Sequence, residues 1–389
     1  MSFEQTIVSY VGCMNSGTFL VVFLCGLVFS ASGWFVTLLS ADPTTIRVPD
    51  DYPTIQEAID AASPGDTIQV AAGAYYERVT VNKTVTLMGE GPLTTIIDGD
   101  IDVINVSYVV ISRFTIIHLT GDGILLERCR DSIINNNVIE GAGRYAIDLL
   151  YSEGNIFTNN SVLDNRDGVA LFESNQNFFI NNKISRNHRD GIIIVESGNN
   201  FFSGNEISEN GEHGITLVTQ YTCGNIFEGN TISKNDYAIV IADAYDNAVY
   251  HNNFIDNGKQ IAAYNEMNIW DWGYPSGGNY WSSHNPPDIY SGPYQNETGS
   301  DGIGDIPYIM DENNTDRYPL IYPYSYVPSP DVNGDEIVDV FDVVTVAEAF
   351  GSIPRDPNWN PAADIVQDEV IDIFDVVTVA GNFGKLLDA

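Results

Sequence analysis

An asparagine repeat constrains the fold of this chain more than any other feature. Six copies of a short pattern each close on an asparagine, and successive copies lie 22 to 25 residues apart. A period of this length is typical of a solenoid in which each unit forms one coil. The closing asparagines are Asn137, Asn160, Asn182, Asn205, Asn230 and Asn252.

A second marker, a small residue followed by an aliphatic one, recurs with nearly the same spacing. Apolar residues alternate with period two around it, as at Ile192 and Ile194, which indicates short strands. Stacked coils would bury the inward side chains and superimpose the asparagines, so that their amides hydrogen-bond from coil to coil. We therefore predict an all-β fold, a parallel β-helix solenoid. The asparagines are expected to act as scaffold in turns with left-handed backbone geometry. The markers are Gly123-Ile124, Ala146-Ile147, Gly168-Val169, Gly191-Ile192, Gly214-Ile215 and Ala238-Ile239.

Residues 46–99 are expected to form the front of the same solenoid. Thr54 and Glu57 match a capping box at the start of the run TIQEAIDAA, and Ser63-Pro64-Gly65-Asp66 would end that helix. Its apolar face would cover the unpaired strand edges of the first coil.

The segment IRVPDDYPTIQEAIDAASPGDTIQVAAGAYYERVTVNKTVTLMGEG resembles the amino-terminal part of NosD-like and pectin-esterase-like proteins. The coils that follow resemble the carbohydrate-binding and sugar-hydrolase (CASH) repeats of the same group, over roughly residues 46–326. The resemblance implies a right-handed parallel β-helix. The group contains lyases, hydrolases, esterases, epimerases, binding proteins and copper-delivery accessories, so the fold alone does not specify an activity.

A segment dense in Tyr, Trp, Gly and Pro closes the solenoid at residues 264–326 and resembles the closing segment of surface NosD-like proteins. Two interpretations are open. The aromatic residues could cover the last coil, which needs a cap for solubility. Alternatively they could form a platform that stacks on sugar rings. The candidate carbohydrate-binding residues are Trp270, Trp272, Tyr280 and Trp281.

The last 60 residues contain a different repeat. DVNGDEIVDVFD at 331–342 and DIVQDEVIDIFD at 364–375 are offset by 33 residues, with carboxylates at loop positions 1, 5, 9 and 12. Ca²⁺ takes six to eight oxygen ligands, and a twelve-residue loop leading into a helix supplies them at such spacings. Each loop is followed by an amphipathic helix. The arrangement resembles a type I dockerin, which implies two calcium loops and a cohesin-like partner.

The expected metal ligands are carried over position by position. The second loop has Val366 at position 3, which removes one oxygen and should lower its affinity for Ca²⁺. An acidic helical hairpin that binds no metal is the alternative. The partner-recognition positions of such modules are Val340-Phe341 and Ile373-Phe374. The candidate ligands are Asp331, Asn333, Asp335, Asp339 and Asp342 in the first loop, and Asp364, Asp368, Asp372 and Asp375 in the second.

The N-terminal segment predicts export. Residues 5–41 carry no charged side chain and are apolar for long enough to span a bilayer, so residues 1–41 form a signal peptide or a membrane anchor. The expected division is then 42–263 for the β-helix, 264–326 for its cap and 327–389 for the dockerin-like module. Cys129 and Cys223 would lie about four coils apart, roughly 19 Å, beyond the reach of a disulfide.

The chain carries a formal net charge of −37, which argues against a nucleic-acid partner. An extracellular or cell-surface protein with a polysaccharide or glycan as partner is expected.

A catalytic site is the alternative to simple binding. Glu173 and Glu196 follow the small-residue marker at the same distance on adjacent coils, about 5 Å apart, and Asp148 lies nearby. Retaining glycosidases use two carboxylates at such a separation. No copper site is evident, because the histidines occupy different positions on their coils. The competing functions are thus a glycan-binding surface protein, a polysaccharide hydrolase or lyase and, more remotely, a copper-delivery accessory.

Overall fold

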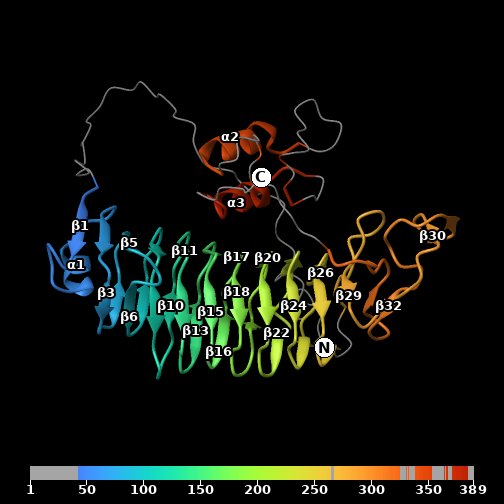
Figure 1. Ribbon diagram of the computed structural model, residues 1–389, viewed down its shortest axis with the longest axis horizontal. Coiled ribbons are helices and arrows are strands. Elements are labelled where there is room, and N and C mark those ends of the chain that lie inside the picture. The colour runs from blue at the N-terminus through green and yellow to red at the C-terminus, as the bar shows by residue number, and fades with distance from the viewer. Residues whose placement is uncertain are drawn as a thin grey trace, which may run out of the picture.

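The computed structural model describes residues 43–263, 267–324, 330, 332, 338–352, 363, 365–366 and 370–383. Within these residues the chain winds into a long parallel β-helix, and two short helices near the C-terminus lie beside it (Figure 1). Strands one coil apart pair in parallel in all three long sheets. The predicted all-β solenoid is therefore confirmed.

The strands of the solenoid form three sheets, named A, B and C here. Sheet A contains β1 (Thr45–Val48), β2 (Thr67–Val70), β5 (Thr86–Gly89), β8 (Val110–Ser112), β11 (Ile133–Asn135), β14 (Ile156–Thr158), β17 (Phe178–Ile180), β20 (Phe201–Ser203), β23 (Ile226–Glu228) and β26 (Ala248–Tyr250). Sheet B contains β3 (Gly73–Tyr75), β6 (Thr95–Asp98), β9 (Thr115–Ile117), β12 (Val138–Glu140), β15 (Ser161–Leu163), β18 (Lys183–Ser185), β21 (Glu206–Ser208), β24 (Thr231–Ser233), β27 (Asn253–Ile255) and β29 (Tyr280–Trp281). Sheet C contains β4 (Val79–Val81), β7 (Ile101–Ile104), β10 (Ile124–Glu127), β13 (Tyr145–Leu150), β16 (Asp167–Phe172), β19 (Ile192–Val195), β22 (His213–Val218), β25 (Tyr237–Ala242) and β28 (Lys259–Ala263).

The core of the solenoid consists of inward side chains that stack on their counterparts one coil away. Phe157, Phe179, Phe202 and Phe227 are fully buried, and the rings of neighbouring coils stack nearly parallel with centroids 4.6 to 4.9 Å apart. The small residues of the second marker stand where coils approach closely: a Cβ on Gly191 would lie 2.6 Å from the carbonyl oxygen of Gly214. Packing between coils therefore explains both periodic signals.

The asparagines form buried hydrogen-bonded ladders, as predicted. In the typical case of Asn205, the side-chain oxygen accepts the backbone N–H of Asn182, and the side-chain amide donates to Phe179 O at 2.7 Å and to Asn230 Oδ1 at 2.9 Å. Two further ladders repeat this pattern at other corners of the coil. They comprise Asn155, Asn177, Asn200, Asn225, Asn247 and Asn268, and Asn165, Asn187, Asn210, Asn235 and Asn257.

The expected left-handed geometry of the ladder asparagines is wrong by one residue. The residue that precedes each of them, except Asn268, has a positive φ, as at Asn159 (φ 54°) and Asn181 (φ 53°). The chain bends at that preceding residue. The ladder asparagine can therefore turn inward and bond to the coils on either side.

Helix α1 (Ile55–Ala61) covers the first coil as expected, with Ile55, Ala58 and Ile59 fully buried. Thr54 Oγ1 accepts the amide of Glu57, and the carboxylate of Glu77, one coil away, accepts the amides of the first two helical residues. Caps at the start of the helix thus join it to the solenoid.

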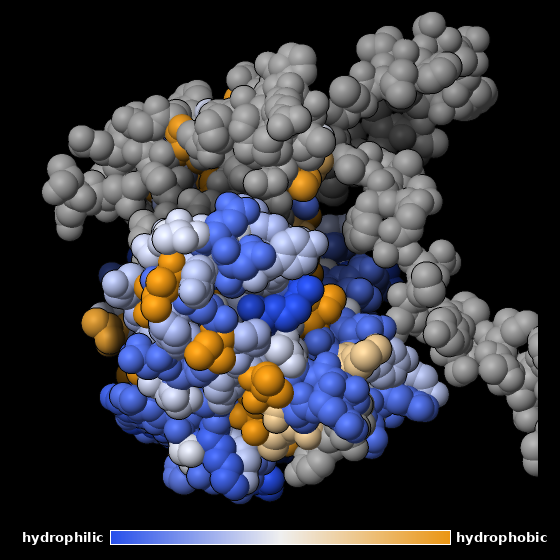
Figure 2. All heavy atoms as spheres, turned by 90° about the vertical axis from the view of Figure 1, so that its right-hand side faces the viewer, coloured by the Kyte–Doolittle hydropathy of each residue, from blue (hydrophilic) through white to orange (hydrophobic). Residues whose placement is uncertain are grey.

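The far end of the solenoid is closed by residues 267–324, with two small hairpins. Asn314 accepts the backbone amide of Asn268, and Asp316 accepts that of Asn279, so these two residues end two of the ladders. Figure 2 views the molecule from this end and shows a mainly hydrophilic surface with separate hydrophobic spots. The segment therefore caps the last coil. The hairpins pair β30 (Tyr290–Ser291) with β31 (Glu297–Thr298) and β32 (Tyr308–Ile309) with β33 (Thr315–Asp316).

The C-terminal helices are α2 (Val340–Ala349) and α3 (Ile373–Ala380), which pack together around a small apolar core that includes Val338, Val346, Ile371 and Val379. We refer to the described residues from 330 to 383 as the C-terminal module. None of the helices among the described residues is long and apolar enough to cross a bilayer. The predicted signal or anchor at 1–41 lies outside the described residues.

Candidate functional site

The outward face of sheet C carries one polar or aromatic side chain per coil where its strands begin. We call this set the sheet C row. The pairing of Tyr145 with Asp167, and of His213 with Tyr237, places these residues in register on neighbouring strands. The row comprises Asp122, Tyr145, Asp167, Asp190, His213, Tyr237 and Lys259.

Carboxylates of the row hold the backbone of the next coil. Asp122 Oδ1 accepts the amide of Tyr145 at 3.1 Å, and Asp190 Oδ1 accepts that of His213 at 3.2 Å. The second oxygen of each carboxylate has another partner, Arg144 for Asp122 and Thr216 for Asp190. The row thus combines a structural ladder with side chains directed outward.

Asp148, a predicted candidate for catalysis, lies on β13 beside this row. It is fully buried, and neither carboxylate oxygen has a hydrogen-bond partner. The nearest cation, Nη2 of Arg144, is 3.5 Å from Asp148 Oδ2. An ionised carboxylate in such a place has lost its hydration without gaining hydrogen bonds in return.

This environment favours the protonated form of the acid. Burial, reinforced by the charge of Asp122, raises the pKa of Asp148 to about 7, although Arg144 acts in the opposite direction. Asp102, two coils earlier at the equivalent position, also has a raised pKa, mainly because of burial and then because of Asp100. Two coils correspond to about 10 Å.

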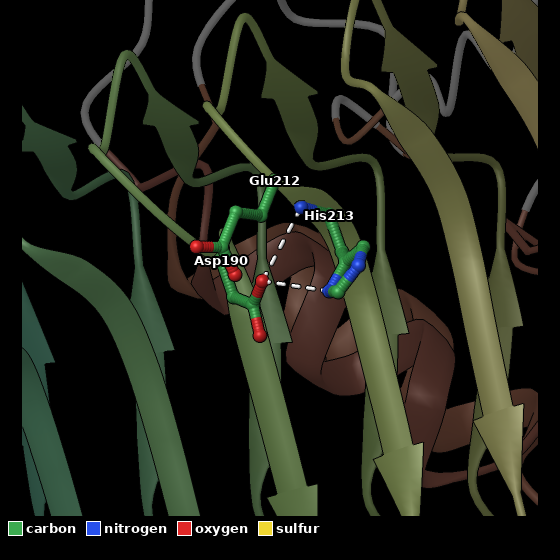
Figure 3. Close-up of side chains that lie close together, drawn as sticks. All are labelled: Asp190, Glu212 and His213. Carbon is green, nitrogen blue, oxygen red and sulfur yellow. Dashed lines mark hydrogen bonds and ion pairs between the residues drawn. The ribbon is translucent and has the colours of Figure 1, made fainter.

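A second cluster lies further along the row, where Asp190, Glu212 and His213 bring one ligand atom each to within 4.8 Å of one another. Figure 3 shows Asp190 and His213 facing each other from neighbouring strands, with His213 Nδ1 2.9 Å from Asp190 Oδ1. Burial raises the pKa of Asp190, while the nearby imidazole lowers it. Glu212 is held by the guanidinium of Arg189 at 3.2 Å.

The donors of this cluster do not fit the copper that the resemblance implies. It offers a single imidazole and two carboxylates, whereas copper sites in proteins draw on several imidazoles or on soft sulfur ligands. The guanidinium of Arg189 beside Glu212 opposes a cation there. The described thiol of Cys129 is buried and free, and it is not a member of this cluster. Its free state also agrees with the prediction that it forms no disulfide with Cys223.

The structure does not bring the three acidic candidates together. Glu173 and Glu196 stand in left-handed turns after β16 and β19, both exposed, whereas Asp148 pairs in register with Ala170 in the middle of the strand. Glu196 lines a shallow depression of about 480 Å³ with Thr219, Gln220, Tyr221 and Asp243. Asp148 therefore stands apart from the two glutamates, whose expected pairing on adjacent coils stays a prediction.

The aromatic candidates of the cap divide into two kinds. Trp270 and Trp281 are 1% exposed, and their indole N–H groups donate to Asn314 and Asp316, the residues that end the ladders. Buried in this way, the two indoles present no free face to a sugar, so their expected role as a platform is wrong. Trp272 is 49% exposed and Tyr280 is half-buried.

The expected calcium loops are described only in part. Asp342 is fully buried, and its two oxygens accept the amides of Val332 and Asp339, loop positions 2 and 9. Asp375 in the second loop makes the corresponding bonds. A carboxylate turned into the loop at position 12 in both repeats fits a hard oxygen site for Ca²⁺. The remaining expected ligands Asp331, Asn333, Asp335, Asp364 and Asp368 lie outside the described residues.

Sequence reasoning missed the sheet C row because its members differ in type from coil to coil. An aspartate aligns with a tyrosine, and a histidine with another tyrosine, so no repeated letter marks the position. A count from the small-residue marker would have found six of the seven, since each member except Lys259 lies immediately before a marker.

The comparisons with known proteins agree with this architecture. A family model described as "Periplasmic copper-binding protein (NosD)" matches residues 77–286. No curated protein matches the chain.

Several solved structures are similar to this chain at low identity. An alginate lyase from Paenibacillus sp. str. FPU-7 is 15% identical over 61% of this chain and 98% of its own, with a TM-score of 0.42. The catalytic domain of a GH87 alpha-1,3-glucanase is 14% identical over 66% of this chain and 62% of its own, with a TM-score of 0.45. The Dettilon tailspike protein (gp208) is 13% identical, with a TM-score of 0.42, over 61% of this chain and 66% of its own. Likenesses at this level do not bear on activity.

The family match covers the solenoid from its second coil into the cap and spans more than half of the 389 residues. Together with the parallel β-helix, it shows that this chain belongs to the NosD family.

Proposed function

We propose that this protein binds a polysaccharide along the outward face of sheet C. The observation that carries the proposal is the sheet C row, which has one polar or aromatic side chain on each of seven successive coils, all of them at least partly exposed except Asp167 and Asp190. Coils repeat at about 4.8 Å, so a linear polymer lying along the solenoid axis would meet one member of the row on each coil. Carboxylates accept hydrogen bonds from sugar hydroxyls, and aromatic rings pack on their apolar faces.

The charges of the row favour a neutral, hydroxyl-rich polymer. Arg144 pairs with Asp122, and Arg189 pairs with Glu212, so acids on this face are paired with bases. Such a surface presents both donors and acceptors without a strong local charge of one sign. A polyanion would also meet the overall charge of −37.

The proposal also covers the cellular location of the protein and its attachment to a partner. The uncharged segment at 5–41 supports export, with a periplasmic or cell-surface location and either cleavage or anchoring. The duplicated loops support a calcium-binding module that attaches the chain to a cohesin-like partner. These parts rest on the sequence and, for the loops, on the buried carboxylates of Asp342 and Asp375.

Glycoside hydrolysis is the second candidate, favoured by one observation. Glu173 and Glu196 are both exposed, in equivalent turns of adjacent coils roughly 5 Å apart, and retaining glycosidases use two carboxylates at such a separation.

The two candidates are separated by one experiment on the chain from residue 42 onward. Migration in native gels containing neutral or acidic polysaccharides measures binding, and reducing-end release measures hydrolysis. Retardation by a neutral polymer without product supports binding alone. Product that Glu173→Gln abolishes, and Asp164→Asn leaves unchanged, supports hydrolysis. Neither retardation nor product with any polymer would contradict the proposed function.

A further inference from the structure

The outward face of sheet A carries an unbroken apolar row over seven coils, in contrast with that of sheet B. The first outward position of each sheet A strand carries an aliphatic or aromatic residue, and we call this set the sheet A strip. The corresponding position of sheet B is mostly polar, so the solenoid itself does not require an apolar exterior. The strip consists of Val110, Ile133, Ile156, Phe178, Phe201, Ile226 and Ala248. The sheet B counterparts are Thr115, Val138, Ser161, Lys183, Glu206, Thr231 and Asn253.

Helix α3 of the C-terminal module lies on this strip. The ring of Phe374 is 4.5 Å from that of Phe201 and 6.1 Å from that of Phe178, centroid to centroid. At the other end of the helix, Asn159 Nδ2 donates to Gly381 O at 2.5 Å. Figure 1 shows α3 on the side of the module that faces the solenoid, with α2 beyond it.

Phe374 is available for this contact because the module does not use it internally. The core of the module is built from other residues, among them Val346, Ile371 and Val379. The covered residue Phe201 is only 4% exposed, whereas Ile133, three coils earlier on the same strip, is 36% exposed. An apolar strip of this length on a protein surface is typical of an interaction site.

We propose that the sheet A strip is the docking surface for the chain's own C-terminal module, with Phe374 as its anchor. While the module is docked, the ring of Phe374 in the first turn of α3 packs on the solenoid, whereas Ile373 beside it is 46% exposed. A partner that contacts the ring of Phe374 must first displace the module from the solenoid. The contact of the module with the sheet A strip thus competes with the binding of another protein to Phe374. It is independent of the proposed function of sheet C, because it involves the other face of the coils.

The contact can be tested by disulfide cross-linking in the full chain. A Cβ on Gly381 would lie 3.5 Å from Thr158 Cγ2, and Gly381 has ordinary right-handed helical geometry, so Thr158→Cys with Gly381→Cys should form an internal disulfide. The control pair is Thr158→Cys with Val344→Cys, since Val344 lies on α2 and is 46% exposed. Mass spectrometry of the linked peptides measures the yield.

The anchor is tested by adding a second change to the cross-linking pair. Phe374→Asp should reduce the linked fraction about tenfold, as expected for the loss of at least 1.4 kcal/mol of contact energy. Phe383→Ala, a change at an exposed position beyond α3, should leave the yield unchanged. Equal yields from both cysteine pairs, or a yield that Phe374→Asp does not alter, would overturn the proposal. Circular dichroism of each variant verifies that the module still folds.

Discussion

Arg144 lies beside Asp148 without forming a hydrogen bond to it. Its Nη2 is 3.5 Å from Asp148 Oδ2, while its Nη1 is 3.1 Å from Asp122 Oδ2 and is aligned for a hydrogen bond. The guanidinium therefore donates its hydrogen bond to Asp122. The carboxylate of Asp148 is left buried away from water and without a hydrogen-bond donor. A protein keeps such a costly group mainly where function needs it.

The first prediction concerns the stability cost of Asp148. Its folded-state pKa of about 7 lies above the ordinary value of 3.8, so the folded state binds the extra proton between these pH values, and stability falls as the pH rises through that window. Asp148→Asn removes this cost. The variant should be more stable than the parent near pH 8, by roughly 2 to 4 kcal/mol, and nearly equal to it near pH 4.

Urea unfolding of both proteins at the two pH values measures the difference. Asp164→Asn is the matched control, because the hydrogen bond from Arg186 lowers the pKa of Asp164 at an exposed site. That change should leave stability nearly unchanged or slightly lower near pH 8. A destabilised Asp148→Asn protein near pH 8 would show that this carboxylate is compensated after all.

The second prediction concerns the ladders. Asn205→Ala would leave the buried amide of Asn182 and the carbonyl of Phe179 without their partners. We expect a loss of about 2 to 4 kcal/mol in the free energy of unfolding. The control is Glu206→Ala, next to Asn205 in the sequence. It removes an exposed ion pair with Lys183 and should lower the free energy of unfolding by less than about 1 kcal/mol. Equal costs in chemical denaturation would contradict the structural role of the ladder.

The third prediction separates the cap tryptophans. Trp281 is buried, stacks on Phe254 with centroids 4.1 Å apart and donates to Asp316, so Trp281→Ala should destabilise the solenoid by about 3 to 5 kcal/mol. Trp272 is 49% exposed and should tolerate the same change within about 1 kcal/mol. Thermal unfolding of the two variants measures both effects. A similar loss for both would mean that the exposed ring also supports the cap.

The fourth prediction concerns calcium. Isothermal titration of the metal-free full chain with Ca²⁺ should detect two sites, the weaker one in the loop where Val366 replaces an oxygen ligand. The matched changes at loop position 5, Asp335→Ala and Asp368→Ala, should remove the tighter and the weaker site respectively. Absence of heat on titration, with no change in helicity, would leave an acidic hairpin that binds no metal.

Much of the fold could be predicted from the sequence because it is repetitive. The spacing of Asn137, Asn160 and their successors reports directly on the coil length. Since each coil contacts only its neighbours, a period in the sequence becomes a period in space. The capping helix was equally readable from Thr54 and the apolar positions after it.

The candidate site could be predicted only in part. Asp148 was identified as an acid near the coil surface, but its burial depends on side chains from adjacent coils, which no local pattern reveals. The same limit applies to Trp270 and Trp281, whose aromatic character suits a sugar platform as well as a core. The contact of Phe374 with Phe201 joins residues far apart in the chain with no shared period, and no spacing predicts it.

Binding of a neutral polysaccharide by variants of the sheet C row tests the account most directly. Tyr145→Ala combined with Tyr237→Ala removes both aromatic members of the row, and Tyr294→Ala changes a tyrosine of the cap that is 84% exposed. Affinity electrophoresis against the polymer that retards the parent protein should show at least about a tenfold weaker interaction for the double variant, and no change for Tyr294→Ala. Undiminished binding by the double variant would place the polysaccharide elsewhere and contradict the account.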